Sequence, residues 1–172
     1  DLPFYAGETE FSPEFRKKFR EYFEVNDNAR EEIQNSFAVG KDGLYIVSNF
    51  ALYKVIFNDE TKKMEMDAKW NETFHRNGDL IHSYDRIIKD GQLNDGSGTT
   101  PTLIGNEFVA ICDNDTDRIN LVIYSQETGE LVSKHKIFSE GASACENSVI
   151  AYGKSLMVGN THNYKDPFKL NP

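Results

Sequence analysis

Three stretches of this 172-residue chain repeat one pattern: an apolar strand, a glycine, a polar turn, a second apolar strand and a final asparagine. They are FAVGKDGLYIVSN (37–49), PTLIGNEFVAICDN (101–114) and SVIAYGKSLMVGN (148–160). Their glycines, Gly40, Gly105 and Gly153, are separated by about 65 and 48 residues. A repeat of roughly 40 to 50 residues made of short strands is typical of a β-propeller blade. We expect each glycine to supply the positive φ of a tight hairpin turn.

Alternation of apolar and polar residues predicts further strands at 51–57, 62–70, 118–125 and 130–138. Turn residues at 58–61 and 127–129 join them in pairs. The sequence therefore predicts a mostly β protein of antiparallel propeller blades. The blades are expected at 36–70 and 99–138, with a long loop insertion at 71–98 and the start of a third blade at 143–172.

The first 35 residues have a different period and form an expected N-terminal helical segment. In FSPEFRKKFREYFE, Ser12 is a helix N-cap and Pro13 the first helical residue. One apolar stripe follows, made of Phe15, Phe19, Tyr22 and Phe23. An amphipathic helix of this kind packs on the propeller core or on a partner.

About 2.5 to 3 blades do not close a ring, since propellers usually contain four to eight. We therefore expect another protein chain, or a cleaved continuation of the same polypeptide, to complete the propeller. The formal net charge of −9, with no basic cluster, argues against nucleic acid as a partner. The sequence contains no apolar run of the roughly 18 residues that a membrane span needs. Periplasmic or extracellular localisation is the expectation for a chain that starts at Asp1.

The chain has two cysteines, Cys112 and Cys145, at comparable places in neighbouring repeats. A disulfide between them and a pair of buried free thiols are both compatible with the pattern. A metal-binding or nucleophilic role is a third alternative.

The asparagines that end the repeats predict a ligand site. Inner strands of propeller blades line the central channel, so these asparagines recur at one height, near one mouth of the channel. Acidic and amide residues adjoin them in the sequence. The predicted ligand-binding set is Asn49, Asp113, Asn114, Glu146, Asn147 and Asn160.

Alternate carboxylates at Asp113, Asp115 and Asp117 resemble the start of a calcium-binding loop. Arg118 and Tyr124 stand where an EF-hand needs glycine and glutamate, so the segment is not an EF-hand. Bound calcium and a solvated turn with Asx hydrogen bonds both remain open. The spacing of the four histidines does not favour zinc.

Four segments, GSGTTPTLIG, VAICDND, NLVIYSQETGELV and SACENSVIAYG, resemble the quinoprotein-like β-propellers of bacteria. This family is related to the pyrroloquinoline-quinone alcohol dehydrogenases, and the similarity is clearest over 97–164. The resemblance implies the propeller fold, on which dehydrogenases, scaffolds and proteins without a cofactor occur. The tryptophan-docking repeat of the true dehydrogenases is not visible, so pyrroloquinoline quinone is not the expected cofactor.

Three functions are compatible with these features. The favoured one is a propeller module that binds a ligand or a protein as part of a larger assembly. The alternatives are a quinone- or metal-dependent oxidoreductase, and a calcium-dependent, lactonase-like hydrolase that holds its metal with Asn and Glu. Few histidine, arginine and lysine residues lie near the recurring asparagines, which favours the binding function.

Overall fold

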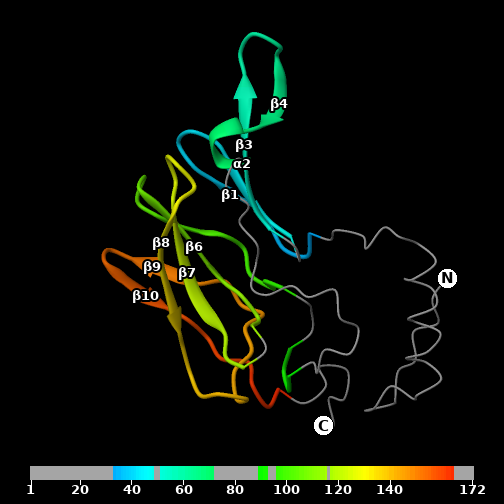
Figure 1. The fold of residues 1–172 in the computed structure, drawn as a ribbon, viewed down its shortest axis with the longest axis vertical. Coiled ribbons are helices and arrows are strands. Elements are labelled where there is room, and N and C mark those ends of the chain that lie inside the picture. The colour runs from blue at the N-terminus through cyan, green and yellow to red at the C-terminus, as the bar shows by residue number, and fades with distance from the viewer. Residues whose placement is uncertain (1–32, 49–50, 72–88, 93–95, 116, 165–172) are drawn as a thin grey trace, which may run out of the picture.

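A computed structural model describes residues 33–48, 51–71, 89–92, 96–115 and 117–164 of the chain. The expected N-terminal helix, Asn49 and most of the 71–98 loop lie outside these residues. The described part is mostly β and consists of three antiparallel sheets (Figure 1). No helix within these ranges is long and apolar enough to cross a membrane.

The strands of each sheet follow one another in chain order, as predicted for an antiparallel meander. The first sheet contains β1 (Ala38–Val39), β2 (Leu44–Val47), β3 (Leu52–Asn58) and β4 (Lys63–Met66), and helix α2 (Ala68–Asn71) follows it. The second contains β5 (Thr102–Ile104), β6 (Phe108–Cys112), β7 (Asn120–Ser125) and β8 (Leu131–Lys136). The third contains β9 (Ile150–Tyr152) and β10 (Ser155–Met157).

The predicted strand at 62–70 is too long, because the chain turns into α2 after Met66. Asp67 starts the turn: its Oδ1 accepts a hydrogen bond from the Lys69 amide at 3.0 Å, and its carbonyl accepts one from the Trp70 amide at 3.1 Å. A side-chain acceptor of this kind favours a helix start over a continued strand. The turn directs Trp70 into the core, where it is 1% exposed.

Two of the three repeat glycines have the predicted backbone conformation. Gly105 and Gly153 both have φ of 57° and occupy the hairpin turns β5–β6 and β9–β10. Gly40 does not have a positive φ, so the prediction is wrong there. A Cβ atom at Gly40 would lie 2.9 Å from the Tyr45 ring, so close packing is the reason for that glycine.

A first hydrophobic core lies between the first and second sheets. Trp70 packs edge-on against Tyr45, with ring centroids 5.4 Å apart. The core consists of Tyr45, Val47, Leu52 and Trp70 from the first sheet and its helix, and Val109, Ile111, Val122 and Tyr124 from the second. These side chains alternate along β2, β6 and β7, as expected for strands with one face against this core.

A second core covers the opposite face of the second sheet. It contains Cys112, Ile119, Cys145 and Val149, with Leu121, Ile137, Leu156 and Val158 packed around them. Strands β5 and β9 lie in contact, and the Thr102 hydroxyl donates to the Val149 carbonyl at 2.6 Å. Strands β6 and β7 of the second sheet are therefore covered on both faces, between the first sheet and the third, whereas the edge strand β8 is mostly exposed.

Candidate functional site

The predicted site residues lie just beyond the end of β6, and adjacent residues there turn to different partners. Asp113 contacts Asn120 and Lys134 of the second sheet. Asn114 instead contacts Cys145 and Glu146, ahead of the third sheet. The alternation of side chains along a strand explains the divergence. Neighbouring members of the predicted ligand set thus have different partners, and the ligand site itself stays a prediction.

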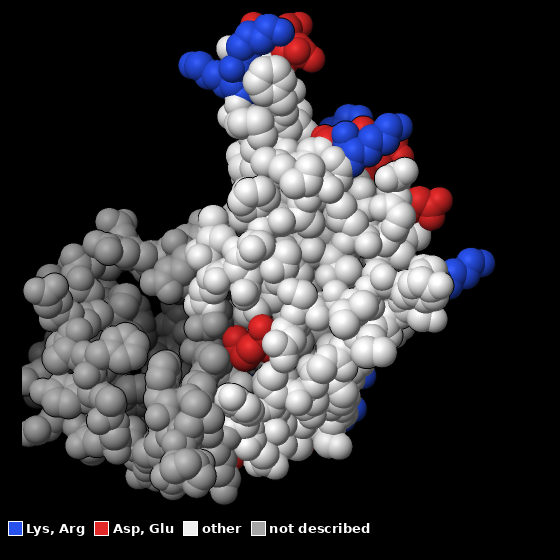
Figure 2. Space-filling view, turned by 180° about the vertical axis from the view of Figure 1, so that it is seen from behind, with Lys and Arg blue, Asp and Glu red and all other residues white. Residues whose placement is uncertain are grey.

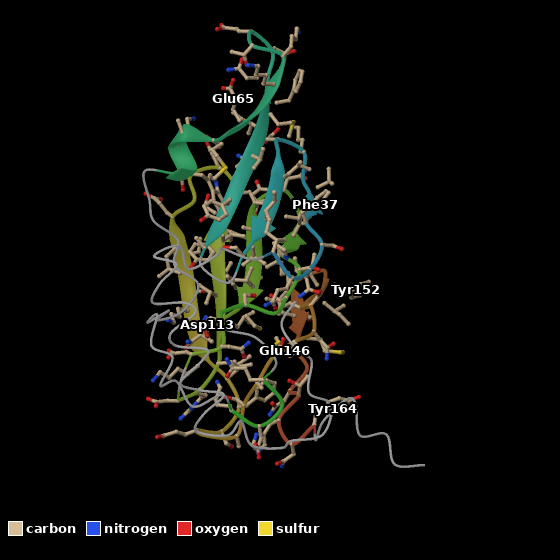
Figure 3. All side chains as sticks on the ribbon, turned by 90° about the vertical axis from the view of Figure 1, so that its right-hand side faces the viewer. Phe37, Glu65, Asp113, Glu146, Tyr152 and Tyr164 are labelled. Atoms are coloured by element: carbon tan, nitrogen blue, oxygen red, sulfur yellow. The ribbon has the colours of Figure 1, made fainter. Side chains whose placement is uncertain are left out.

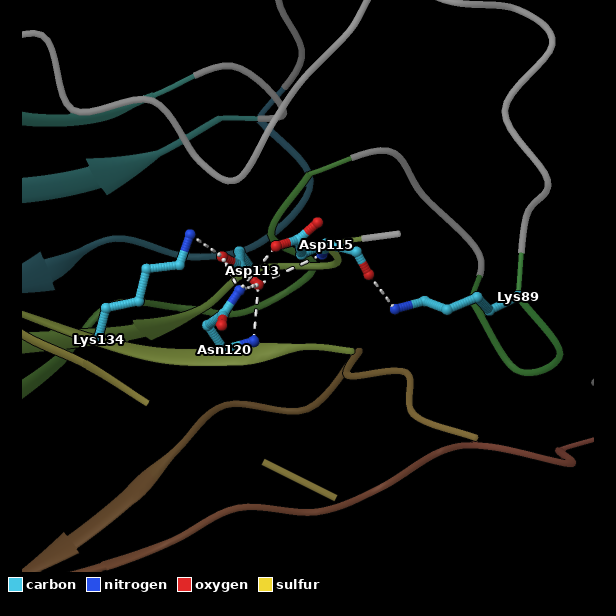
Figure 4. A network of polar contacts seen from close by, with 5 residues as sticks. All are labelled: Lys89, Asp113, Asp115, Asn120 and Lys134. Carbon is cyan, nitrogen blue, oxygen red and sulfur yellow. Dashed lines mark hydrogen bonds and ion pairs between the residues drawn. The ribbon is translucent and has the colours of Figure 1, made fainter. Parts of the chain in front are cut away.

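Asp113 is the centre of a buried polar network (Figure 4). The Asn120 side-chain amide donates to both carboxylate oxygens, at 3.0 and 2.9 Å. The Asn120 backbone amide donates to Oδ1 at 2.7 Å, and the Asp115 amide donates to the same atom at 3.3 Å. The Lys134 ammonium lies 3.6 Å from Oδ2. The network ties the loop after β6 to strands β7 and β8.

Burial raises the pKa of Asp113, because desolvation penalises its charged form. The hydrogen bonds from Asn120 and the charge of Lys134 oppose this effect without cancelling it. Asn120 is itself fully buried, and its Oδ1 has no hydrogen-bond partner among the described residues. The carboxylate is thus an internal anchor whose oxygens are already engaged.

The three aspartates proposed as metal ligands have hydrogen-bond partners within the chain. Asp115 accepts a hydrogen bond from the Asn120 side chain at 3.1 Å, and its carbonyl accepts one from Lys89. The Asp117 carbonyl accepts from the Gly141 amide at 2.7 Å. Across the described ranges, no group of three or more His, Cys, Asp or Glu side chains could hold a metal ion. The Asx hydrogen bond of the other alternative is present, since Asp113 Oδ1 accepts from the amide two residues later, but Asp113 is fully buried, so the turn is not solvated there.

Asn114 joins three separate segments around a buried side chain. Its Nδ2 donates to the carbonyls of Gly96 at 2.9 Å and Cys145 at 3.2 Å, and lies 3.4 Å from Glu146 Oε1. Its Oδ1 accepts from the Cys145 amide at 3.1 Å. A Cβ atom at Gly98 would lie 2.1 Å from Glu146 Oε2, so this glycine allows the carboxylate to pack against the backbone. Asn114 and Glu146 are the predicted ligand residues that the structure brings together.

Asn160 holds the same inter-sheet segment from the other side. Its Oδ1 accepts from the Ala144 amide at 3.2 Å, and its Nδ2 donates to the Ala142 carbonyl at 3.0 Å. Asn147 is exposed, and its carbonyl accepts from the Cys145 thiol at 3.2 Å. The recurring asparagines Asn114 and Asn160 thus bind backbone groups of residues 142–145.

The two cysteines meet in the second core, and both are fully buried. The hydrogen bond between the thiols and their burial raise the pKa of Cys112. The same hydrogen bond lowers the pKa of Cys145, because it stabilises the thiolate of the accepting sulfur. Both residues are free thiols in this structure, so a disulfide between them stays a prediction.

A second polar centre, which the sequence analysis missed, joins the first two sheets. The Gln126 carbonyl accepts hydrogen bonds from the Tyr45 hydroxyl at 3.2 Å, Lys54 Nζ at 2.9 Å and Trp70 Nε1 at 3.1 Å. Lys54 also pairs with Asp67 at 3.2 Å, and the two side chains are only 6% and 13% exposed. The sequence did contain a signal for this polar centre. Lys54 stands in an alternating apolar strand, at a position that faces the core.

No protein-family model, curated protein or solved structure significantly matches this chain. The resemblance to quinoprotein-like propellers therefore stays a prediction that rests on the sequence segments alone.

Proposed function

We propose that this chain is a protein-binding and assembly module, in which three blade-like sheets are completed by further sheets of a partner chain or of a longer polypeptide. One observation carries the proposal. Strands β6 and β7 of the middle sheet are covered on both faces, whereas the first and third sheets each carry exposed apolar side chains on the face turned away from it. Consecutive blades of a propeller cover one another in this way.

The outward face of the first sheet carries an apolar row that crosses all four strands. The register pairs Val39 with Leu44, Leu44 with Val55 and Val55 with Met66. Val39 is 70% exposed and Met66 44% exposed. On the same face, Phe57 pairs with Met64, and both are exposed. A face of this composition is typical of a sheet that packs against another protein layer.

The third sheet has the same character on its outward side. Ile150 and Met157 are directly paired and are 61% and 67% exposed, while Tyr152 is 86% exposed. Leu156 precedes Met157 in β10, so its side chain lies on the opposite face of the sheet, where it packs into the second core. Phe37, Tyr152 and Tyr164 lie along one side of the molecule (Figure 3). Figure 2 shows charged groups at the tip of β3–β4, in a second cluster below it at the right edge, and in one acidic patch near the centre, with uncharged surface between them.

These features favour an apolar sheet face of another polypeptide as the partner. Covering exposed apolar surface contributes about 25 cal/mol per Å². The two enzymatic alternatives have less support, because they need ligand oxygens at Asp113 and Asn114. Both side chains are engaged by hydrogen bonds within the chain.

The proposal is tested by the association state of the isolated chain, measured by light scattering after size exclusion. We expect concentration-dependent self-association, because the uncovered faces have no other partner. The double variant Tyr152→Lys/Met157→Lys should weaken it, since two charges then oppose burial of the third sheet. Val132→Lys is the control: Val132 is 51% exposed but lies in β8, the edge strand of the second sheet. A monodisperse monomer at every concentration, in wild type and variants alike, would contradict the proposal.

A further inference from the structure

The only two cysteines of the chain come together from different sheets. Cys112 ends β6 of the second sheet, and Cys145 lies in the segment that leads to β9 of the third. Both side chains are 0% exposed and belong to the same apolar cluster, with Ile119 and Val149 as neighbours. Their separation in sequence is 33 residues, so chain connectivity alone does not place them together.

Hydrogen bonds fix the backbone on both sides of this contact. Asn114, two residues after Cys112, accepts from the Cys145 amide and donates to the Cys145 carbonyl. The Thr161 amide donates to the Ala144 carbonyl at 2.9 Å. The two sulfur-bearing positions are therefore held in register by polar contacts that are independent of the sulfur atoms.

Both thiol side chains lie in one small buried cluster. Cys145 Sγ donates to the Asn147 carbonyl at 3.2 Å, and Cys112 belongs to the same four-residue buried core. The fold thus brings the two sulfur-bearing side chains into one part of the interior. A disulfide needs such proximity, together with Cα atoms about 4.4 to 6.8 Å apart.

We propose that Cys112 and Cys145 form a disulfide that covalently joins the second sheet to the third. The oxidant is a disulfide of another molecule, either a low-molecular-weight one or that of an oxidoreductase. The Cys145 thiolate attacks one sulfur of the oxidant and releases a first thiol. The Cys112 sulfur then displaces the second thiol and forms the new S–S bond. Two cysteine S–H bonds are lost, and the two protons and two electrons reduce the oxidant to two thiols.

Complete burial determines when this exchange takes place. A disulfide oxidant reaches the sulfurs only before the two sheets pack or while they are transiently separated. After bond formation, the same burial protects the disulfide from reductants. The inference is independent of the assembly proposal, because both sulfurs lie inside one chain.

The test counts free thiols in the full wild-type chain after equilibration in buffers of reduced and oxidised glutathione. Samples are quenched with acid, unfolded and alkylated, and intact masses are recorded. We expect two alkylated thiols per chain in reducing buffer and none in oxidising buffer, with one peptide pair linked between residues 112 and 145. The single variants Cys112→Ala and Cys145→Ala should instead retain one thiol or carry one glutathione.

Two outcomes would overturn the inference. One is wild-type protein that keeps both thiols after it has been unfolded and refolded in oxidising buffer. The other is a linked species that is a dimer of chains, with no intramolecular peptide pair. Neither outcome depends on whether a variant folds, because the decisive sample is the wild-type protein.

Discussion

Asn114 holds both backbone polar groups of Cys145: its Oδ1 accepts from the Cys145 amide at 3.1 Å, and its Nδ2 donates to the Cys145 carbonyl at 3.2 Å. The Asn114 side chain thus makes the same pair of hydrogen bonds that one strand residue makes with a residue of a neighbouring strand. These bonds link the second sheet to the segment ahead of the third. Asn114 and Asn160, which end the second and third repeats, thus both bind backbone groups of the segment ahead of the third sheet.

Replacement of Asn114 by alanine should destabilise the protein by about 2 to 4 kcal/mol, because it leaves several buried backbone groups unpaired. Asn160→Ala is the matched control, since Asn160 contacts the same segment from an exposed position. Water can replace its hydrogen bonds, so we expect a loss below about 1 kcal/mol. Urea unfolding monitored by Trp70 fluorescence measures both values. Equal losses of unfolding free energy in the two variants would show that the buried hydrogen bonds of Asn114 contribute no more to stability than the exposed ones of Asn160.

Lys54→Met should cost about 3 to 5 kcal/mol, because it leaves the Asp67 carboxylate uncompensated near the first core. The control is Lys62→Met. Lys62 pairs with Asp59 at 3.1 Å, a similar distance, but the two side chains are 70% and 86% exposed. We expect no resolvable change there, since solvent screens exposed pairs.

A second comparison separates lost charge from lost packing. The double variant Lys54→Met/Asp67→Asn removes the uncompensated charge and keeps an oxygen for the Lys69 amide. It should therefore unfold at a higher urea concentration than Lys54→Met alone. If the two variants are equally unstable, the ion pair is not the cause.

The raised pKa of Asp113 gives a defined pH dependence of stability. A carboxyl group whose pKa is higher in the folded state binds its proton more tightly there. Its contribution to the free energy of unfolding is therefore largest below about pH 4, near the ordinary pKa of aspartate. That contribution falls as the pH rises to the folded-state pKa.

The difference in unfolding free energy between wild type and Asp113→Asn isolates this effect, because the other carboxylates are common to both proteins. We expect the difference, wild type minus variant, to decline as the pH rises from about 4. Lys134→Met should extend the decline to higher pH, because Lys134 lowers the pKa of Asp113. A difference that grows with pH would mean that the pKa is lowered in the folded protein.

The proposed disulfide predicts a change in stability between redox states. A bond between Cys112 and Cys145 closes a loop of 33 residues, for which chain entropy gives a stabilisation of about 3 to 4 kcal/mol. Denaturant unfolding of the oxidised and reduced wild-type chain measures this difference. Cys145→Ala should show the same stability in both buffers.

Much of the fold was predictable because its signals are local. The alternation in 51–57 and 118–125 predicts strands, where the structure has β3 and β7, and the turn residues at 58–61 and 127–129 predict where the chain reverses. Pairing of adjacent strands into antiparallel sheets follows from such short connections. The error at 62–70 has a local cause too: Asp67 caps a helical turn that the alternating pattern concealed.

The candidate site was less predictable, because its geometry depends on contacts between distant segments. Asp113 and Asn114 are neighbours in sequence, and their residue types suggested a common ligand. The pleat directs them to different partners, Asn120 and Cys145, and the packing of the sheets supplies those partners.

The sequence by itself determined most of the strands, the turns and the antiparallel pairing, since period-two alternation and turn chemistry act over a few residues. Only the tertiary structure decided which polar groups meet. The Lys54 ammonium binds the Gln126 carbonyl across 72 residues of sequence, and Cys112 meets Cys145 in a core between two sheets. Most buried polar groups in proteins are hydrogen-bonded to a partner. Which group becomes that partner depends on which sheet faces pack together. The distance between residues along the sequence does not indicate this.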